Sequence, residues 1–382
     1  MKFTLIGLAF FLQPVFWLGL LRSYFNYHFR IKRTRYLFNV SIDDDHYELR
    51  HFGVNLILFG VGASVFSYLT EIILPLRWLL IYEGLASFCL VVFPWAVWSL
   101  VILIAASLAT LCLIRSYAVP NQNYLILTGI FLLAGGLFLM LDGGRHNIPQ
   151  LFKNQRGNRV AGYLFKELTV FPLLVMVPGN DLRRLINFYP TFSVRGHSVA
   201  LVLLPILISF RFTVFRHLAR RLFKRMGYWW LALGIVGIIL ATVSYVMPVI
   251  ILPSLIGLLI LTVLVWLAFR YLDLKHGDWY SSPVSGVRVL GVESGTPASR
   301  MGLKVGDVIL KVNHRIINNE TEFYEALQAH PTYCRLKIRN QNRRLELAGT
   351  AIFMSSPHEI GVILDRDPNP NRLINRKPFY GR

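Results

Sequence analysis

Three short stretches of the sequence contain residue types that can hydrolyse a peptide bond, and HYELRH (46–51) is the nearest to a metal site. A zinc protease helix needs two histidines four residues apart, with the glutamate directly after the first, so that both rings and the base share one face. His46 and His51 are five residues apart, and Glu48 follows Tyr47. With this spacing the two histidines do not lie on one face of a helix, so we predict no metal site.

The serine and aspartate candidates also lack the pattern of an active site. GHSVA (196–200) contains Ser198 but not the second glycine of a nucleophile elbow, and no predicted span holds a histidine partner. Asp142 in LMLDGG has no second intramembrane aspartate with which to share a proton. The sequence therefore predicts no catalytic residue, no cofactor and no enzyme activity, although triads assemble in space and not along the chain.

Composition predicts that lipid solvates much of this chain. Of its 382 residues, 54% are hydrophobic and only 16% are charged, which is typical of a polytopic membrane protein. The excess of 40 Lys and Arg over 20 Asp and Glu favours basic cytoplasmic loops over nucleic-acid binding, because no recognition motif accompanies the charge. Cys89, Cys112 and Cys334 have no metal-ligand spacing and predict neither a zinc site nor a disulfide.

Apolar runs predict about seven helical spans, possibly six to nine, at roughly 20 residues per crossing. The first run has no cleavage signature, so it is expected to be an anchor and not a removed signal peptide. Segments 168–179 and 198–210 are short and contain proline, and they could be short spans, re-entrant pieces or interfacial segments. The predicted spans are 3–21, 53–70, 78–94, 95–114, 124–141, 228–246 and 250–269.

Basic residues predict the orientation of the chain. Three basic loops fall on one side of this map together with everything after Arg270, and that side is expected to be the cytoplasm. The loops contain Arg22, Arg30, Lys32, Arg33, Arg35 and Arg50; Lys153, Arg156 and Arg159; and Arg216, Arg220, Arg221, Lys224 and Arg225.

Three features near the predicted spans allow a further prediction each. The aromatic and basic segment 24–38 could be a helix on an anionic lipid surface or an ordinary juxtamembrane anchor. Glu83 is a functional candidate, because a charge in lipid is unfavourable unless it reaches water. Gly60 and Ser64 have a spacing that suits close helix packing.

A soluble domain begins after Tyr280, where short alternating stretches with turn residues replace the lipid-grade runs. Asn319 is expected to cap an amphipathic helix, with Glu322 three residues on. The expected order is a strand at 287–295, a short helix at 296–304, a strand, turn and strand at 306–317, the amphipathic helix at 318–330 and a hairpin of 334–340 with 343–349.

GVESGTPASRMGLKVGDVILKVN closely resembles the core of bacterial PDZ domains, in which a strand, a small-residue helix and a Gly-Asp turn lead to a second strand. The carboxylate-binding loop, an apolar-Gly-apolar segment, is missing near the start; HEIGVILD (358–365) supplies it at the far end, as in rearranged, circularly permuted PDZ domains of bacterial membrane proteins. The resemblance implies a small α+β PDZ domain. Its motif positions are Gly295, Pro297, Ala298, Gly302, Leu303, Gly306, Asp307 and Asn313.

HEIGVILD is then expected to be the edge strand of a peptide groove, because an exposed edge accepts an extended peptide and glycine lets the backbone approach closely. Tyr324 or Gln328 would face the peptide, and Phe323 with Leu327 the core. The alternative is an edge strand that only completes the sheet. No basic residue clearly completes a carboxylate clamp, which favours internal or helical partners over free C-termini. The predicted groove residues are Glu320, Phe323, Tyr324, Leu327, Gln328, Glu359, Ile360, Gly361, Val362, Ile363 and Leu364.

The whole chain resembles the MinJ family of Gram-positive bacteria. FFLQPVFW, then FRIKRTRYLF before HYELRH, and NQRGNRVAGYLFKELTVFPLLVMVPG carry this resemblance. The sequence thus predicts a transmembrane domain (1–275), a cytoplasmic PDZ domain (280–366) and a basic, flexible tail (367–382).

The resemblance implies a multi-pass adaptor of the cell membrane, placed at septum and poles, that acts in division-site selection. It would bridge a DivIVA-like scaffold and a MinD-type inhibitor, contact divisome components and membrane lipid, bind no nucleic acid, and possibly form homo-oligomers. The alternative class is a PDZ-containing intramembrane protease or a protease-accessory protein.

Overall fold

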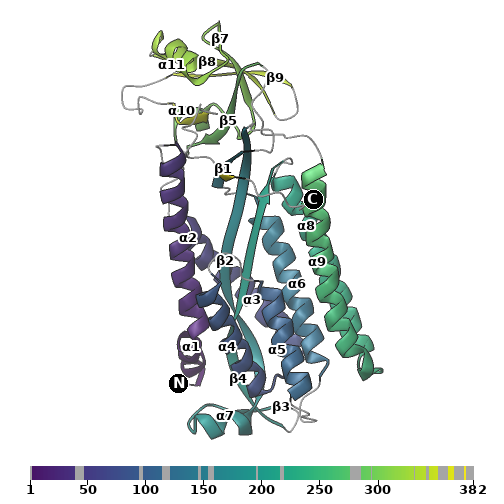
Figure 1. The fold of residues 1–382 in the computed structure, drawn as a ribbon. Coiled ribbons are helices and arrows are strands. Elements are labelled where there is room, and N and C mark those ends of the chain that lie inside the picture. The colour runs from purple at the N-terminus through teal and green to yellow at the C-terminus, as the bar shows by residue number, and fades with distance from the viewer. Residues whose placement is uncertain are drawn as a thin grey trace.

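The computed structural model describes most of the chain, and Figure 1 shows an elongated helical body with the PDZ domain at one end. The N-terminus lies at the opposite end of the body. The described residues are 2–38, 47–93, 98–113, 121–144, 148–153, 159–194, 197–215, 219–275, 285–293, 295–330, 332–340, 344–351, 360–364 and 374–375.

Apolar helices occur at each predicted span, although they differ in length. Within the described residues, four helices are long and apolar enough to cross a membrane, and α1 with α2, bent by 55°, would make a fifth. The exact number of spans therefore stays a prediction. The helices of the body are α1 (Lys2–Phe11), α2 (Pro14–Phe38), α3 (Tyr47–Leu69), α4 (Leu76–Val92), α5 (Ser99–Leu113), α6 (Asn123–Leu141), α7 (Gly179–Leu185), α8 (Ala219–Val243) and α9 (Ile251–Lys275), with a 3₁₀ turn η1 (Pro248–Ile250).

The aromatic and basic segment 24–38 continues α2 as one helix instead of starting a separate loop. Pro14 begins this helix, where its missing N–H is no loss, and the chain bends just before it. Glu83 of α4 accepts a hydrogen bond from the Val15 amide at 3.4 Å. A carboxylate near a helix N-terminus is favoured by the helix dipole, so Glu83 has a structural role at this bend.

Segments 168–179 and 198–210 are not short helical spans. They belong to two long antiparallel strands, β2 (Arg159–Pro178) and β4 (His197–Val214), which run side by side through the helical body (Figure 1). Their register is continuous from Tyr163 opposite Val214 to Pro178 opposite Val199. Shorter strands extend this sheet in the order β11-β1-β2-β4-β3: β1 (Ile148–Lys153), β3 (Phe192–Val194) and β11 (Ile374–Asn375).

The edge strands of a sheet inside an apolar body need hydrogen-bond partners, because a backbone N–H or C=O without a hydrogen bond is strongly unfavourable there. Side chains of the surrounding helices supply these partners. On β2, Ser64 Oγ donates to the Pro172 carbonyl and accepts from the Leu174 amide, both at 3.0 Å, and Ser67 donates to the Leu174 carbonyl at 2.5 Å. The small residues of α3 therefore pack against a strand, not against another helix as the spacing of Gly60 and Ser64 predicted.

The edge of β4 is capped in the same way, along almost its whole length. Pro172 and Pro205 lie opposite each other, and their backbone groups face away from the partner strand. The N–H that proline lacks is therefore not needed for a hydrogen bond between β2 and β4. The bonds to β4 are Tyr189 Oη to Leu201 O (2.8 Å), Gln13 Nε2 to Leu203 O (2.6 Å), Tyr82 Oη to Pro205 O (3.3 Å), Leu207 N to Tyr82 Oη (3.0 Å), Ser209 N to Ser99 Oγ (3.2 Å) and Arg270 Nη1 to Thr213 O (2.7 Å).

Helices α6 and α8 pack backbone to backbone through glycines. A Cβ on Gly136 would lie 2.9 Å from the Gly227 carbonyl, and a Cβ on Gly227 would lie 2.8 Å from the Gly136 carbonyl. Seven residues away on each helix, a Cβ on Gly129 would lie 3.1 Å from the Gly234 carbonyl. Small residues thus let these two helices approach closely, as is common between membrane helices.

The C-terminal domain has the elements that the motif predicted. Its sheet has the order β10-β5-β6-β8-β9, with β7 paired to β6. The elements are β5 (Val287–Val292), α10 (Pro297–Arg300), β6 (Val308–Val312), β7 (Arg315–Ile316), α11 (Glu320–Gln328), β8 (Tyr333–Arg339), β9 (Leu345–Ala351) and β10 (Val362–Leu364).

Candidate functional site

Helix α11, which the sequence predicts to be one wall of a peptide groove, is capped at its N-terminus as expected. The Asn319 side chain accepts from the Glu322 amide at 2.8 Å, and Glu322 Oε2 accepts from the Asn318 amide at 2.7 Å. This pair of reciprocal bonds satisfies two backbone donors and fixes where the helix starts. The cap therefore sets the direction in which the side chains of α11 point.

The predicted groove residues of α11 divide into two groups by burial. Phe323 and Leu327 are buried in the PDZ core, together with Ile360, Val362 and Leu364 of the C-terminal segment. Tyr324 and Glu320 are half-buried, and Gln328 is exposed. The helix and the C-terminal segment thus share one core, and Tyr324 and Gln328 remain accessible. Their role in peptide binding stays a prediction.

Strand β10 lies at the end of the PDZ sheet and pairs with β5. Its other edge has no strand beside it among the described residues, which is the condition for adding an extended peptide. Of the other predicted groove residues, Ile363 of β10 is buried and Glu359 lies outside the described part of the chain. The rearranged strand order remains a prediction, although the segment at the end of the chain does lie next to β5.

Gly361 occupies a conformation that other residues rarely adopt, with φ +78°. A Cβ at this position would also collide with the side chain of Thr296. The carbonyl of Gly361 accepts from the Glu293 amide, and the carbonyl of Ile360 accepts from the Ala298 amide, both at 2.9 Å. These bonds hold the loop before β10 against the start of α10, so only glycine fits here without moving the strand.

A buried contact fixes the PDZ domain on the helical body. The register between β5 and β10 shifts at Leu290, which has no partner on β10, and the Tyr163 hydroxyl of β2 donates to the Leu290 carbonyl at 2.9 Å. Tyr163 and Leu290 are only 2% and 1% exposed. Figure 1 shows β5 standing directly over the end of β2. Sequence reasoning missed this contact, because a lone tyrosine in an apolar strand has no distinctive signal.

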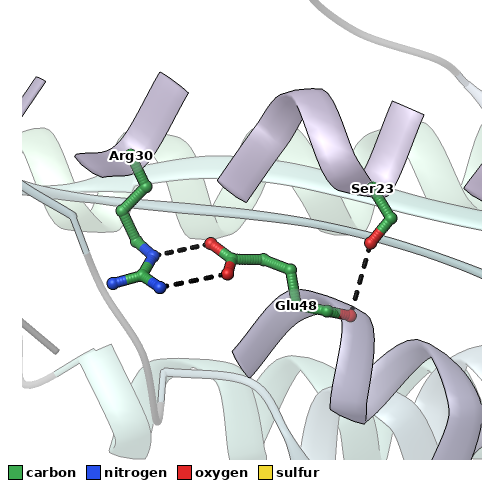
Figure 2. A network of polar contacts seen from close by, with 3 residues as sticks. All are labelled: Ser23, Arg30 and Glu48. Carbon is green, nitrogen blue, oxygen red and sulfur yellow. Dashed lines mark hydrogen bonds and ion pairs between the residues drawn. The ribbon is translucent and has the colours of Figure 1, made fainter. Parts of the chain in front are cut away.

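The former zinc candidate HYELRH contributes to a polar network between helices instead. Figure 2 shows Glu48 of α3 facing Arg30 of α2, and the guanidinium donates from Nε and Nη2 to the two carboxylate oxygens at 2.6 and 3.1 Å. Ser23 donates to the Glu48 carbonyl at 3.3 Å. Both charged side chains are 9% exposed. This geometry with two hydrogen bonds suits a structural ion pair. A general base, by contrast, would need access to a substrate.

The other catalytic candidates are also placed in structural contacts. His51 Nδ1 lies 3.4 Å from Asp142 Oδ1, and Asn55 donates to the second oxygen of Asp142 at 2.9 Å. Ser198 lies near the start of β4, opposite Ser193, while His51 lines a small polar cavity beside Thr169. Since β2 rises about 3.3 Å per residue, Ser198 lies roughly 30 Å from His51. His46 lies outside the described residues. Where side chains are described, no group of three or more metal-ligating residues could hold a metal ion.

Comparison with known proteins gives two kinds of match. The family model described as PDZ domain matches residues 267–339. "Probable cell division topological determinant MinJ" of Lacticaseibacillus paracasei is 30% identical over 361 residues, which cover 92% of this chain and 95% of that protein. "Cell division topological determinant MinJ" of Bacillus subtilis (strain 168) is 24% identical over 390 residues, covering 96% and 95%.

A third relative matches only a small part of the chain. The "Serine protease Do-like HtrA" of Lactococcus lactis subsp. lactis (strain IL1403) is 46% identical over 50 residues, which are 13% of this chain and 12% of that protease. This is a partial match of the kind that a shared PDZ domain produces, and it does not extend over a protease as a whole.

The apolar helices, the strand pair between them and the C-terminal sheet define a membrane protein that carries a PDZ domain. The two MinJ relatives match almost from end to end, so their similarity includes the helical body as well as the PDZ domain. The chain belongs to the MinJ family of cell division topological determinants.

Proposed function

We propose that this protein is a multi-pass membrane adaptor that recruits division proteins to the division site through the open edge of its PDZ sheet. The observation that carries the proposal is the position of β10 at the edge of the PDZ sheet. This strand packs in the same hydrophobic core as α11, in a domain that is hydrogen-bonded to the apolar body. An edge strand beside a helix is the geometry used to bind extended peptides. Membership of the MinJ family supports the division role.

The partners that we propose are a DivIVA-like scaffold and a MinD-type inhibitor, which the adaptor would bring together on the cytoplasmic face. The excess of basic residues near the PDZ end of the body supports this orientation. Such a protein acts by binding and not by catalysis. The protease alternative has weaker support, because the protease match is partial and Glu48, His51 and Asp142 take part in structural contacts.

A functional fluorescent fusion, combined with deletion of the gene, tests the division role. We expect fluorescence at septa and poles, and we expect filaments or minicells in the deletion strain. Ser198→Ala, which removes the nucleophile candidate of the protease alternative, should not change division if the proposal is correct. Uniform membrane fluorescence with normal division would contradict it.

Gly361→Ala tests the role of the PDZ edge. The strained backbone at φ +78° and the collision with Thr296 should displace β10 and destabilise the PDZ domain by about 2 kcal/mol. We expect the fusion to stay in the membrane while fluorescently labelled scaffold and inhibitor partners are no longer recruited.

Gly349→Ala is the matched control, because it makes the same chemical change in β9 at the opposite end of the sheet. A Cβ there would meet the hydroxyl end of the Tyr333 side chain, which can move away. Recruitment should therefore be normal in this variant. Normal recruitment with Gly361→Ala as well would show that the β10 edge is not the binding surface.

A further inference from the structure

The sheet of the PDZ domain has an outer face, which is the face turned away from the hydrophobic core. Leu336 and Ile338 of β8 are buried in that core, so Lys337 between them points outward. Leu347 of β9 pairs with Lys337 and therefore lies on the same outer face. Leu347 and its neighbour on this face, Leu345, are 64% and 57% exposed. Neighbouring exposed leucines are a feature of interaction surfaces, whereas a single one needs no explanation.

One row of side chains crosses four strands on this face. Ile316 of β7 pairs with Lys311 of β6, and Lys311 also pairs with Lys337 of β8. Leu347 of β9, the partner of Lys337, completes this outer row. Ile316 is 66% exposed. Because neighbouring strands are about 4.8 Å apart, the outer row is about 14 Å long, with an apolar side chain at each end and two cations between them.

The two cations of the outer row have no counter-charge in the part of the chain that the structure describes. Lys311 and Lys337 take part in no ion pair there. Like charges directly opposite each other on paired strands are destabilising. Arg335 and Arg339, two residues to either side of Lys337 on β8, also point outward and add to the positive charge. An anionic partner would therefore relieve a repulsion that the fold itself contains.

The nearby acidic residues lie on the other face of the sheet. Glu346 alternates with Leu347 on β9, and its carboxylate accepts a hydrogen bond from the Asn340 side chain. Helix α11 carries glutamates, but it packs on the inner face, where Phe323 shares the core with Leu336. Among the described residues of β6, β7, β8 and β9, none that points outward is acidic. The outer face is therefore positively charged.

The arrangement of the outer row favours a protein partner over a lipid surface. A surface that binds membranes has apolar side chains that insert together, with cations around them that meet the headgroups. Here the two lysines separate Ile316 from Leu347. The contact with the helical body is made by β5, and β8 is two strands away from it. Figure 1 shows β7 and β8 farther from the helical body than β5.

We propose that the outer row binds an amphipathic helix of a partner protein, with two acidic residues between two apolar ones on a single face. Positions 1, 5, 8 and 12 of a helix share one stripe and span about 16 Å, which fits a row about 14 Å long. The acids would meet Lys311 and Lys337, and the apolar side chains would cover Ile316 and Leu347. Gly349, the control position for the β10 edge, lies outside the row.

This second binding surface does not depend on the proposed peptide site. The outer row ends on β9, which lies at the opposite end of the sheet from β10. The two sites can therefore be tested separately, and each can fail without the other.

Fluorescence anisotropy of a labelled helical peptide tests the proposal on the purified full-length protein in phosphatidylcholine nanodiscs. The peptide has leucine at positions 1 and 12, glutamate at positions 5 and 8, alanine and glutamine elsewhere, and an uncharged dye. A scrambled peptide of the same composition is its control. We expect the native protein to bind the ordered peptide more tightly. K311Q/K337Q should weaken that binding about 10-fold, because two exposed ion pairs together contribute about 1.4 kcal/mol.

Reversing the charges shows whether the lysines contact the peptide directly. K311E/K337E should lose the glutamate peptide and bind a peptide with lysine at positions 5 and 8, and this gain also shows that the variant is folded. L347S should weaken the binding of the glutamate peptide, because one apolar end is lost. R300Q/K304Q is the matched control, since it removes two exposed basic residues of α10 and the loop after it. It should keep the native affinity.

Four results would overturn the proposal. The first is equal affinity of the native protein for the ordered and scrambled peptides. The second is a K311E/K337E variant that gains no affinity for the lysine peptide. The third is an equal loss in R300Q/K304Q and K311Q/K337Q, which would mean that net charge alone attracts the peptide. The fourth is displacement of the peptide by phosphatidylglycerol vesicles but not by phosphatidylcholine vesicles, which would mean that an anionic lipid surface is the occupant.

Discussion

Glu48→Gln is expected to lower the free energy of unfolding by about 3 to 5 kcal/mol, which is typical when one partner of a buried ion pair is removed. The Arg30 side chain is 9% exposed and its guanidinium makes two bonds to Glu48, so the substitution removes the counter-charge that Glu48 supplies to a buried cation. The measurement is the thermal unfolding midpoint of the purified protein in nanodiscs of one lipid composition.

Two further variants separate the buried charge from other effects. The double substitution R30M/E48L removes both charges and should recover most of the lost stability, because apolar side chains of similar size can replace a buried pair. Arg50→Gln changes an exposed charge two residues after Glu48 and should shift the midpoint only slightly. If Glu48→Gln lowered the unfolding midpoint as little as Arg50→Gln, the prediction would be wrong, because water would then have to solvate the Arg30–Glu48 ion pair.

Gly136→Leu should be the second severe substitution, with an expected loss of about 3 kcal/mol. The new side chain would meet the backbone of α8 at the Gly227 carbonyl and the Leu231 amide, and backbone atoms cannot rotate away as a side chain can. The two helices would have to move apart along their whole contact. The measurement is again the unfolding midpoint, together with the yield of folded protein after membrane extraction.

Gly257→Leu is the matched control for this substitution. It places the same side chain in α9, at a glycine where nothing lies within 4 Å of a built Cβ. A similar loss of stability from Gly257→Leu would show that leucine is disfavoured by general effects on the helix, and not by the packing of α6 on α8.

The PDZ domain could be predicted from sequence nearly strand by strand, because its turns and helix ends are marked by residues with local causes. Asn319 with Glu322 marks the start of α11 through hydrogen bonds that span four residues, and Gly302 ends α10 with φ +75°. Strand β10 was harder to interpret. The match to the PDZ family model stops at residue 339, so only the apolar-Gly-apolar pattern pointed to Gly361.

The strand pair in the helical body could not be predicted from the same kind of signal. An apolar run with proline, such as 198–210, has no periodicity that separates a strand buried on both faces from a short helix. What makes a strand possible there is the capping of its edges by Gln13, Ser64 and Tyr82. These residues are distant in sequence, and nothing in their local pattern shows that they will meet a strand.

The ion pair of Arg30 with Glu48 was missed for a related reason. The sequence places Arg30 among the basic residues of a predicted loop and Glu48 in a stretch that lacks the spacing of a zinc protease. Their partnership depends on α2 continuing to Phe38 and on α3 beginning at Tyr47, so that the two side chains meet across helices. Charge patterns along one segment do not contain this information.

The strand pair also fixes the distance between the PDZ domain and the opposite end of the helical body. Strand β2 alone spans roughly 65 Å at about 3.3 Å per residue, and Tyr163 near one end is bonded to the PDZ domain while Pro178 at the other leads into α7. Sliding one strand past the other by a single residue would turn every side chain to the wrong face. The distance between α7 and the PDZ domain is therefore set by two rigid, paired strands, and a partner that binds β10, as we propose, would meet it at a fixed distance from α7.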